Sequence, residues 1–390
     1  MLRLHCKGWE NTLVQAMKKT NNKASFILST GDQTNNEFGE FNNVDFSEME
    51  YSAFLYPSVL RSIPIATTVG NHDATNPNYL YHFNLPNMSN LGAHEVTGGD
   101  YYYTYGNALF MVLNVQGTDN EEHKEFINKT VKDHPNCKWK IISLHQDIYG
   151  SGEHSNEPEV VKLRYALRPT YEENNIDVVF SGHDHTYSRS QFLKGENTKK
   201  DISFTDDEFI ELYEKDTKTD DGSGMPFVSA ANIKKDTDDE AEKKYLEYLE
   251  SIMDSEAVVN ETKDTQTVKN PKGVLYITTN SASGSHYYEM VAREQSYVAA
   301  RWQEYVPTYS VINISDSTLT INTFRADTNE AIDKEIQIIK DGSSKLISIN
   351  TKVIISICII SVVVVVLLLI FIICKKAQYN KKEESSQRKQ

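Results

Sequence analysis

The sequence predicts an α/β protein in which strands alternate with helices, and three features support this prediction. Five short apolar runs rich in β-branched residues each lead into a small or polar residue, as buried strands often do. Stretches with apolar residues at helical spacing lie between these runs. A further set of apolar runs after Gly273, two of them alternating with polar residues, favours a second and more antiparallel sheet. In such folds the functional residues gather at the carboxyl ends of the strands.

The expected elements divide into two groups along the chain. The first group of strands comprises residues 25–29, 63–69, 109–113, 140–144 and 178–180. The helices expected between them comprise residues 11–18, 46–60, 121–132 and 163–174. The second group of strands comprises residues 274–278, 309–314, 319–324 and 336–339.

A polar insertion separates the two groups. Residues from about 194 to 270 are dense in Lys, Asp and Glu, and one amphipathic helix is expected within them because apolar side chains from Tyr245 to Met253 recur at helical spacing. A charge run of this kind is usually a solvated face. The alternative is a lid that covers substrate.

The overall charge limits the class of partner. With 55 acidic and 40 basic residues, the formal net charge is -15, and recognition of nucleic acid needs concentrated Lys and Arg instead. We therefore expect no nucleic-acid partner. The four cysteines at positions 6, 137, 358 and 374 predict no disulfide framework, because the last two belong to one long apolar run.

That apolar run predicts a transmembrane helix at residues 353–374. It contains 22 residues without a charge, enough to cross a hydrocarbon core of about 30 Å. Residues 341–352 form a short linker before it, and the tail at residues 375–390 carries six basic and two acidic side chains. The tail is therefore expected in the cytoplasm and residues 1–352 outside the cytosol, in a single-pass membrane protein whose helix contacts lipid. Sequons precede the helix at Asn87, Asn128, Asn260 and Asn313, which fits a glycosylated ectodomain.

Polar side chains suited to metal binding follow the strands of the first group. Carboxylate, amide and imidazole ligands on several loops, with one carboxylate shared, are what a pair of divalent cations needs. The residues concerned are Asp32, Asn71, His72, His145, His183 and His185. A lone His after a strand is more often structural, so the evidence lies in their joint order.

The order and spacing of these motifs resemble the calcineurin-like metallophosphoesterase superfamily, in its purple acid phosphatase-like branch. The motifs are Gly31-Asp32, Gly70-Asn71-His72-Asp73, a strand-terminal His145, and Gly182-His183-Asp184-His185. Further similarity lies in residues 101–110, 187–189 and 281–284. The resemblance implies a four-layer α/β/β/α sandwich over about residues 8–340 and a centre of two divalent or mixed-valence ions of Mn, Fe or Zn.

The resemblance also implies a role for each residue. Asp32 would bridge the two metals, Asn71, His145 and His183 would complete the second site, and His185 would serve the first. His72 would face the phosphate-ester substrate, where it stabilises the transition state or protonates the leaving oxygen. A metal-bound hydroxide would attack phosphorus.

Two departures from the family pattern affect these expectations. The family closes its first strand with an Asp ligand ahead of Gly-Asp, whereas here we expect that strand to be missing. His5 and Cys6 are weak substitutes because a terminus without a neighbouring strand is poorly held. Asn35 stands where a purple acid phosphatase has its iron-binding Tyr, so we expect no tyrosinate-ferric centre. An active phosphoesterase and an inactive surface binding module therefore both remain open.

Overall fold

The computed structural model describes residues 2–35, 44–75, 77–92, 96–117, 119–195, 204–219 and 226–341. The chain separates into two compact units, Met1–Lys340 and Asp341–Gln390. The predicted transmembrane helix at residues 353–374 and the basic tail lie outside the described residues, as do the side chains of His5 and Cys6. Among the residues that are described, no helix has the length and apolar character needed to cross a membrane.

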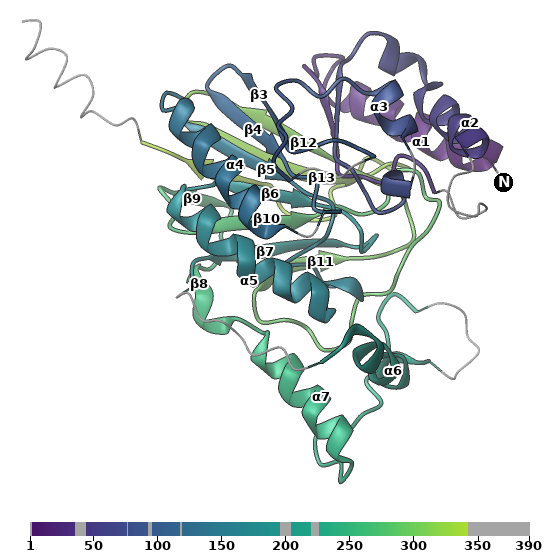
Figure 1. Cartoon of the computed structure of the whole chain (residues 1–390), viewed down its shortest axis with the longest axis vertical. Coiled ribbons are helices and arrows are strands. Elements are labelled where there is room, and N and C mark those ends of the chain that lie inside the picture. The colour runs from purple at the N-terminus through teal and green to yellow at the C-terminus, as the bar shows by residue number, and fades with distance from the viewer. Residues whose placement is uncertain are drawn as a thin grey trace, which may run out of the picture. The chain divides into compact units, whose positions relative to one another are not determined.

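The largest sheet in the described part of the chain has eight strands and contains most of the first group of predicted strands. Seven of them follow the order β11-β7-β10-β6-β5-β4-β3, and β8 pairs with β7 (Figure 1). The strands β4, β5, β6 and β10 run parallel, so their carboxyl ends share one edge of the sheet. Their bounds are β3 (Tyr101–Tyr105), β4 (Ala108–Val112), β5 (Trp139–Ser143), β6 (Val178–Ser181), β7 (Tyr187–Leu193), β8 (Val258–Asn260), β10 (Val274–Thr278) and β11 (Val298–Trp302).

A four-stranded sheet and a two-stranded sheet complete the strand layers. The order of the former is β12-β13-β14-β9, and it is antiparallel except for the parallel pair β14 and β9. Its strands are β12 (Thr308–Ile314), β13 (Thr318–Arg325), β14 (Ile336–Ile339) and β9 (Thr267–Lys269). The two-stranded sheet pairs β1 (Ile27–Ser29) with β2 (Ile65–Thr67) in parallel.

Helices cover the large sheet on one side, and the four-stranded sheet packs on the other. An apolar core joins α4 (Asn120–Asp133) and α5 (Pro158–Glu173) to β4, β5, β6 and β10. A second core lies between the sheets, where Leu319 and Ile338 meet Ile141 and Phe180. Leu28 of β1 packs against this second core. The helix α1 (Leu2–Lys19) lies by the four-stranded sheet, with the Lys19 ammonium over the ring of Phe324.

The remaining helices lie at the ends of the sheets (Figure 1). They are α2 (Val44–Leu55), α3 (Asn78–His82) and the short 3-10 helices η1 (Ser58–Arg61), η2 (Asp73–Thr75), η3 (His154–Asn156) and η4 (Ser255–Ala257). The polar insertion contributes α6 (Asp206–Thr217) and α7 (Glu240–Ser251), whose buried faces meet Val161 of α5 and Val291. Asp239 caps α7 by accepting bonds from two main-chain N–H groups. The amphipathic helix predicted there is confirmed.

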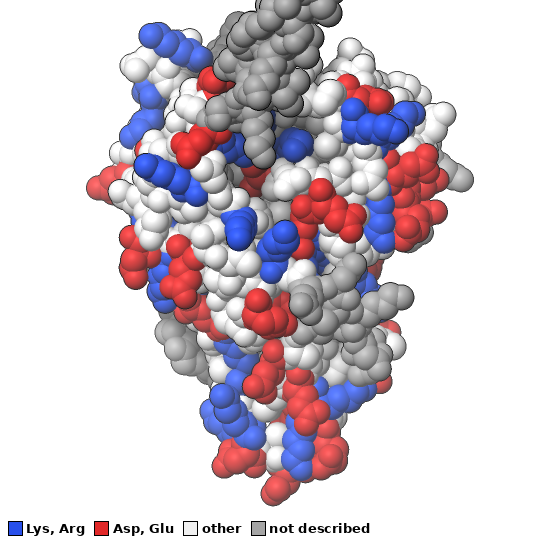
Figure 2. All heavy atoms as spheres, turned by 90° about the vertical axis from the view of Figure 1, so that its left-hand side faces the viewer, with Lys and Arg blue, Asp and Glu red and all other residues white. Residues whose placement is uncertain are grey.

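The mixed α/β fold is confirmed, with two corrections to the predicted arrangement. Residues 274–278 were expected in the second sheet, but as β10 they pair in parallel with β6 in the large sheet. The polar insertion was expected to add only a helix, yet its residues 258–260 and 267–269 form β8 and β9. In β9 only Val268 is buried, so one apolar side chain is enough for an edge strand. On the face shown in Figure 2, basic and acidic side chains are interspersed.

Candidate metal centre

The predicted ligands converge at the carboxyl ends of β1, β2, β5 and β6. Asp32 follows β1, Asn71 follows β2, His145 follows β5 and His183 follows β6. Ligand atoms of Asp32, His145 and His183 all lie within 4.8 Å of one another. The amide oxygen of Asn71 lies 3.0 Å from Nε2 of His145. These four residues form the group that we call the Asp32–His183 cluster.

The hydrogen bonding of His145 shows that the cluster suits a cation. Its Nδ1 lies 2.8 Å from the main-chain oxygen of Thr30, so Nδ1 carries the proton. Its Nε2 then faces Oδ2 of Asp32 at 3.1 Å and Oδ1 of Asn71 at 3.0 Å. Lone pairs on three atoms thus meet at one point, which requires either a second proton on the imidazole or a metal ion. Oxygen and imidazole donors suit Zn, Mn and Fe.

Two glycines of the motifs allow this close approach. A Cβ on Gly31 would lie 2.3 Å from Nδ1 of His145, and a Cβ on Gly70 would lie 2.0 Å from Oδ1 of Asp32. Real side chains do not tolerate such distances, so only glycine fits at either position. The Gly-Asp and Gly-Asn-His motifs are therefore steric requirements of the site.

The backbone is strained at three of the predicted ligands. Asp32, His183 and His185 have φ angles of 52°, 66° and 47°, a left-handed region that non-glycine residues rarely adopt. Such strain costs about 1–3 kcal/mol per residue and gathers at functional sites, where surrounding structure enforces it. The strain thus marks the same loops as the donor geometry.

Protonation in the cluster follows from burial and from charge. Burial alone raises the pKa of Asp32, but the attraction of His145 and a hydrogen bond from it hold that pKa well below its usual range. Burial lowers the pKa of His145, whereas the charge of Asp32 raises it above the usual range overall. Burial and the proximity of His145 hold the pKa of His183 well below its usual range. Neutral His183 therefore offers a free lone pair to a metal.

His185 lies apart from this cluster. Among the described residues it is not within the group whose ligand atoms lie 4.8 Å apart or less, and burial lowers its pKa to about 4. Its ring packs instead against His286 and Tyr288, with centroids 5.6 and 5.1 Å away. Its Nδ1 is buried and has no hydrogen-bond partner among the described residues.

His72 lies beside Asp32, and its main-chain N–H donates to Oδ1 of Asp32 at 3.1 Å. The neighbouring carboxylate of Asp73 is fully buried and accepts from the main-chain N–H groups of Gly70 and Gln33 and from the hydroxyl of Tyr51. Asp73 thereby ties the loop after β1 to the loop after β2. Both loops carry candidate ligands, so this carboxylate fixes their relative position.

Two more histidines line the region, and sequence reasoning gave them little or no weight. His154 packs on His183 with centroids 4.3 Å apart, and its Nδ1 lies 2.8 Å from Glu157. Burial lowers the pKa of His154, but the hydrogen bond to Glu157 and nearby carboxylates raise it to about 9. His286 was not predicted. The only signal for it was its position two residues after the Ser281–Gly284 motif.

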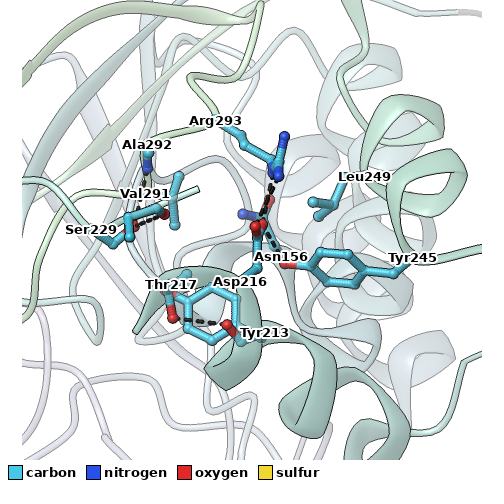
Figure 3. A pocket seen from close by; sticks show the side chains of 11 residues that line it. Asn156, Tyr213, Asp216, Thr217, Ser229, Tyr245, Leu249, Val291, Ala292 and Arg293 are labelled. Carbon is cyan, nitrogen blue, oxygen red and sulfur yellow. Dashed lines mark hydrogen bonds and ion pairs between the residues drawn. The ribbon is translucent and has the colours of Figure 1, made fainter. Parts of the chain in front are cut away.

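A separate cavity lies in the insertion, away from these ligands. Asn156, Tyr213, Asp216, Tyr245 and Arg293 line it, together with six neighbours (Figure 3). Its volume of about 10 Å³ has room for one water molecule at most. A substrate does not fit there, so we place the functional site at the ligand-bearing loops.

Comparison with known proteins gives a family match for part of the chain. Residues 4–187, which contain all six candidate site residues, match the calcineurin-like phosphoesterase family. Purple acid phosphatases 19 and 5 of Arabidopsis thaliana are each 39% identical to this chain over 54 residues, which is 14% of this chain and 13% of each relative. The matched segment is thus a small part of either relative.

The fold is also similar to that of a solved purple acid phosphatase from yellow lupin (Lupinus luteus) seeds. The TM-score is 0.55 at 14% sequence identity, and the match covers 86% of this chain and 49% of the lupin protein. At this identity the similarity concerns the fold alone. The chain spans about half the length of the lupin protein.

Proposed function

The chain belongs to the metallophosphoesterase superfamily and is similar to purple acid phosphatases, and on this premise we propose that it hydrolyses phosphate esters at a metal centre. The observation that carries the proposal is the Asp32–His183 cluster, in which ligand atoms from three separate loops converge within 4.8 Å. A bound divalent ion supplies charge that stabilises phosphoryl oxygens and lowers the pKa of water to near neutrality.

We assign the candidate ligands to two metal ions. Asp32, Asn71, His145 and His183 would hold one ion, and Asp32 and His185 would serve a second. This assignment is supported by the lone pairs that meet at Nε2 of His145, which a metal ion would satisfy in place of a second proton on the imidazole. The donor set is compatible with Mn, Fe or Zn, and two ions are proposed.

His72 is proposed to face substrate. Its main-chain N–H is bonded to Asp32, which places it next to the cluster. From there its imidazole stabilises charge on the phosphoryl group or donates a proton to the leaving oxygen.

The test is hydrolysis of a general aryl phosphate by the purified full chain. Activity should disappear when a chelator removes the metal and return with Mn²⁺ or Zn²⁺. A chain that binds metal in the cluster yet hydrolyses no phosphate ester would support the alternative of a surface binding module. A chain that binds no divalent ion would contradict the proposal.

We further propose that residues 353–374 cross a membrane, with the phosphoesterase unit outside the cytosol. The support is the uncharged run of 22 residues and the basic tail after it. Protease added to intact cells should then remove residues 1–340 and spare the tail. Survival of the large unit, together with unmodified Asn87 and Asn313, would contradict this topology.

A further inference from the structure

The turn between β6 and β7 carries two candidate ligands on a strained backbone. His183 and His185 have positive φ angles of 66° and 47°, and the main-chain N–H of Asp184 between them donates to the main-chain oxygen of Gly182 at 2.8 Å. A backbone of this kind persists only where neighbouring groups enforce it. The groups that enforce it therefore also determine where the two imidazoles lie.

Buried polar groups hold this turn from two directions. On one side, the carboxylate of Asp184 is 0% exposed and accepts from two main-chain N–H groups of the loop after β5, at 2.8 Å each. On the other side, the main-chain oxygen of His185 accepts from Nε2 of Gln303 at 2.8 Å. Gln303 follows β11 and is 2% exposed. The second support thus comes from a residue 118 positions further along the chain.

The amide of Gln303 joins the turn to the loop at residues 281–289, which we call the His286 loop. Its Nε2 donates to the main-chain oxygens of His185 and Tyr288, at 2.8 Å each, and its Oε1 accepts from the main-chain N–H of Tyr305 at 2.9 Å. Two acceptors on the nitrogen side and one donor on the oxygen side fix the orientation of the amide. Both amide protons are used, so an apolar or carboxylate side chain of the same length could not make these bonds.

Tyr288 extends this support from the backbone to the imidazole of His185. The ring of Tyr288 packs against the rings of His185 and His154, with centroids 5.1 Å away in each case. Metal-binding histidines usually have an orienting hydrogen bond on the other ring nitrogen. Nδ1 of His185 is buried and has no hydrogen-bond partner in the described part of the chain. Packing against Tyr288, whose main chain Gln303 holds, takes the place of that bond.

We propose that Gln303 is a positioning residue of the candidate metal centre. It holds the main chain of His185 and the main chain of Tyr288 at fixed positions relative to each other, and it thereby orients the His185 imidazole. Gln303 acts through His185 and is not itself assigned to substrate or metal. The inference rests on the proposed function, in the part that assigns His185 to a metal ion.

The first test follows the His185 ring directly, in the full chain stripped of metal by a chelator. Isotope labelling of histidine Cε1 gives a nuclear magnetic resonance signal for each imidazole, and the signal that is lost in His185→Gln belongs to His185. Gln303→Met keeps the length of the side chain but donates no bond, so the His185 signal should move or broaden. An unchanged His185 signal would overturn the proposal.

The second test measures the consequence for metal binding, by calorimetric titration of the stripped chain with Mn²⁺. In Gln303→Met the affinity of the weaker binding step should fall about tenfold or more, because loss of a group that orients a ligand typically costs about 10- to 100-fold. The tighter step, assigned to the Asp32–His183 cluster, should be unchanged. Equal weakening of both steps would make Gln303 a general support of the fold and would overturn the positioning role.

The matched control is Gln191→Met. Gln191 is also buried, at 6% exposed, and its Oε1 accepts from the main-chain N–H and the hydroxyl of Thr262. This variant should keep the His185 signal and both binding steps of the wild type, and the same changes in it would contradict a specific role of Gln303. If Gln303→Met does not fold, Gln303→Asn replaces it, because the shorter side chain cannot reach both oxygens and should have the same effects.

The possible results separate the two proposals. A wild type that binds only one Mn²⁺ would overturn the role of Gln303 and leave hydrolysis at the Asp32–His183 cluster standing. A wild type that binds two ions but hydrolyses no aryl phosphate would overturn the proposed function, and selective loss of the weaker step in Gln303→Met would still support the positioning role. A wild type that binds no ion would overturn both.

Discussion

The two sides of Asp32 are built differently. On one side, ligand atoms of His145 and His183 lie within 4.8 Å of each other and of Asp32, and Asn71 lies 3.0 Å from His145. On the other side, His185 has a buried Nδ1 without a partner among the described residues, and its ring neighbours come from a loop about 100 positions later. Both sides join segments that are distant in the sequence. On the first side the candidate ligands contact one another directly, whereas on the second side the contacts are between aromatic rings and through the amide of Gln303.

This contrast predicts different sensitivities. Changes to the cluster should act on both ions and on turnover, while changes to the packing of the 281–289 loop should act on the second ion alone. The four experiments below test this contrast, beginning with the largest expected effect.

Replacing the shared carboxylate should have the largest effect. In Asp32→Ala both ions lose a ligand and His145 loses the charge that it faces at 3.1 Å. We expect loss of tight metal binding and a fall in turnover of about 10³ or more. Metal analysis and aryl phosphate hydrolysis measure this, with the exposed Asp133→Ala as the matched control. Retention of two tightly bound ions would show that Asp32 is not shared.

Replacing His72 should separate chemistry from metal binding. His72→Ala leaves the side chains of all proposed metal ligands in place, so the number of bound ions should stay at about two. Turnover should fall by about 10², because a positioned general acid or electrostatic partner is lost. His134→Ala, which removes a histidine that lies on α4 and bonds the main-chain oxygen of Thr130, serves as the control. Unchanged turnover in His72→Ala would show that His72 takes no part in catalysis. Loss of bound metal would show that His72 supports the metal site.

Replacing Gly8 should weaken the second side without touching a ligand. Alanine favours a helix over glycine by up to about 1 kcal/mol, but the added Cβ would meet the oxygen of Ser283 at 1.9 Å, and overpacking costs about 1–3 kcal/mol. We expect the cost of the steric clash to exceed the gain in helix propensity. We expect the affinity for the second Mn²⁺ to fall about tenfold, which equals about 1.4 kcal/mol.

The control for this change is the exposed neighbour Lys7→Ala, which alters the same helix without a clash. Isothermal titration with Mn²⁺ resolves the two binding steps. Equal weakening of both steps, or of neither, would mean that α1 does not support the His286 loop selectively.

Removing a buried ion pair in the insertion should have the smallest effect on the cluster. Arg293 donates to both oxygens of Asp216, whose side chain is 2% exposed (Figure 3). Arg293→Met leaves that carboxylate unpaired and should lower the free energy of unfolding by about 3 kcal/mol, the lower end for a buried pair, because Arg293 itself is partly exposed. The tightly bound ion should remain.

Arg325→Met is the matched control, because Arg325 pairs with the exposed side chains of Asp327 and Glu304. Such surface pairs contribute at most about 1 kcal/mol. Urea denaturation compares the two variants. Equal losses of unfolding free energy in the two variants would contradict the idea that burial of the ion pair determines the cost of removing it. Loss of the tightly bound ion in Arg293→Met would show that the insertion is coupled to the Asp32–His183 cluster.

The sequence by itself predicted the parallel strands β4, β5 and β6 and the side chains that gather in the Asp32–His183 cluster. Buried strands such as β4 and β6 are continuous apolar runs, which no exposed segment tolerates, so their positions were predicted to within one or two residues. The glycines before Asp32 and Asn71 are visible in the sequence as parts of motifs, although the side chains that exclude a Cβ there, His145 and Asp32, come from other loops. The apolar pattern of a buried strand depends on the residues of that strand, so it can be recognised in the sequence.

Only the tertiary structure decided the partners of β7, β8, β9 and β10 and what lies beside His185. β8 and β9 have few buried side chains, so the sequence indicated only a polar insertion at these positions. β10 was assigned to the wrong sheet because the apolar pattern of a strand does not show which strand it pairs with. The contact between His185 and His286 joins residues about 100 positions apart through the bonds of Gln303. A contact between residues so far apart produces no periodic pattern in the sequence of either segment, because it depends on how the layers of the fold stack.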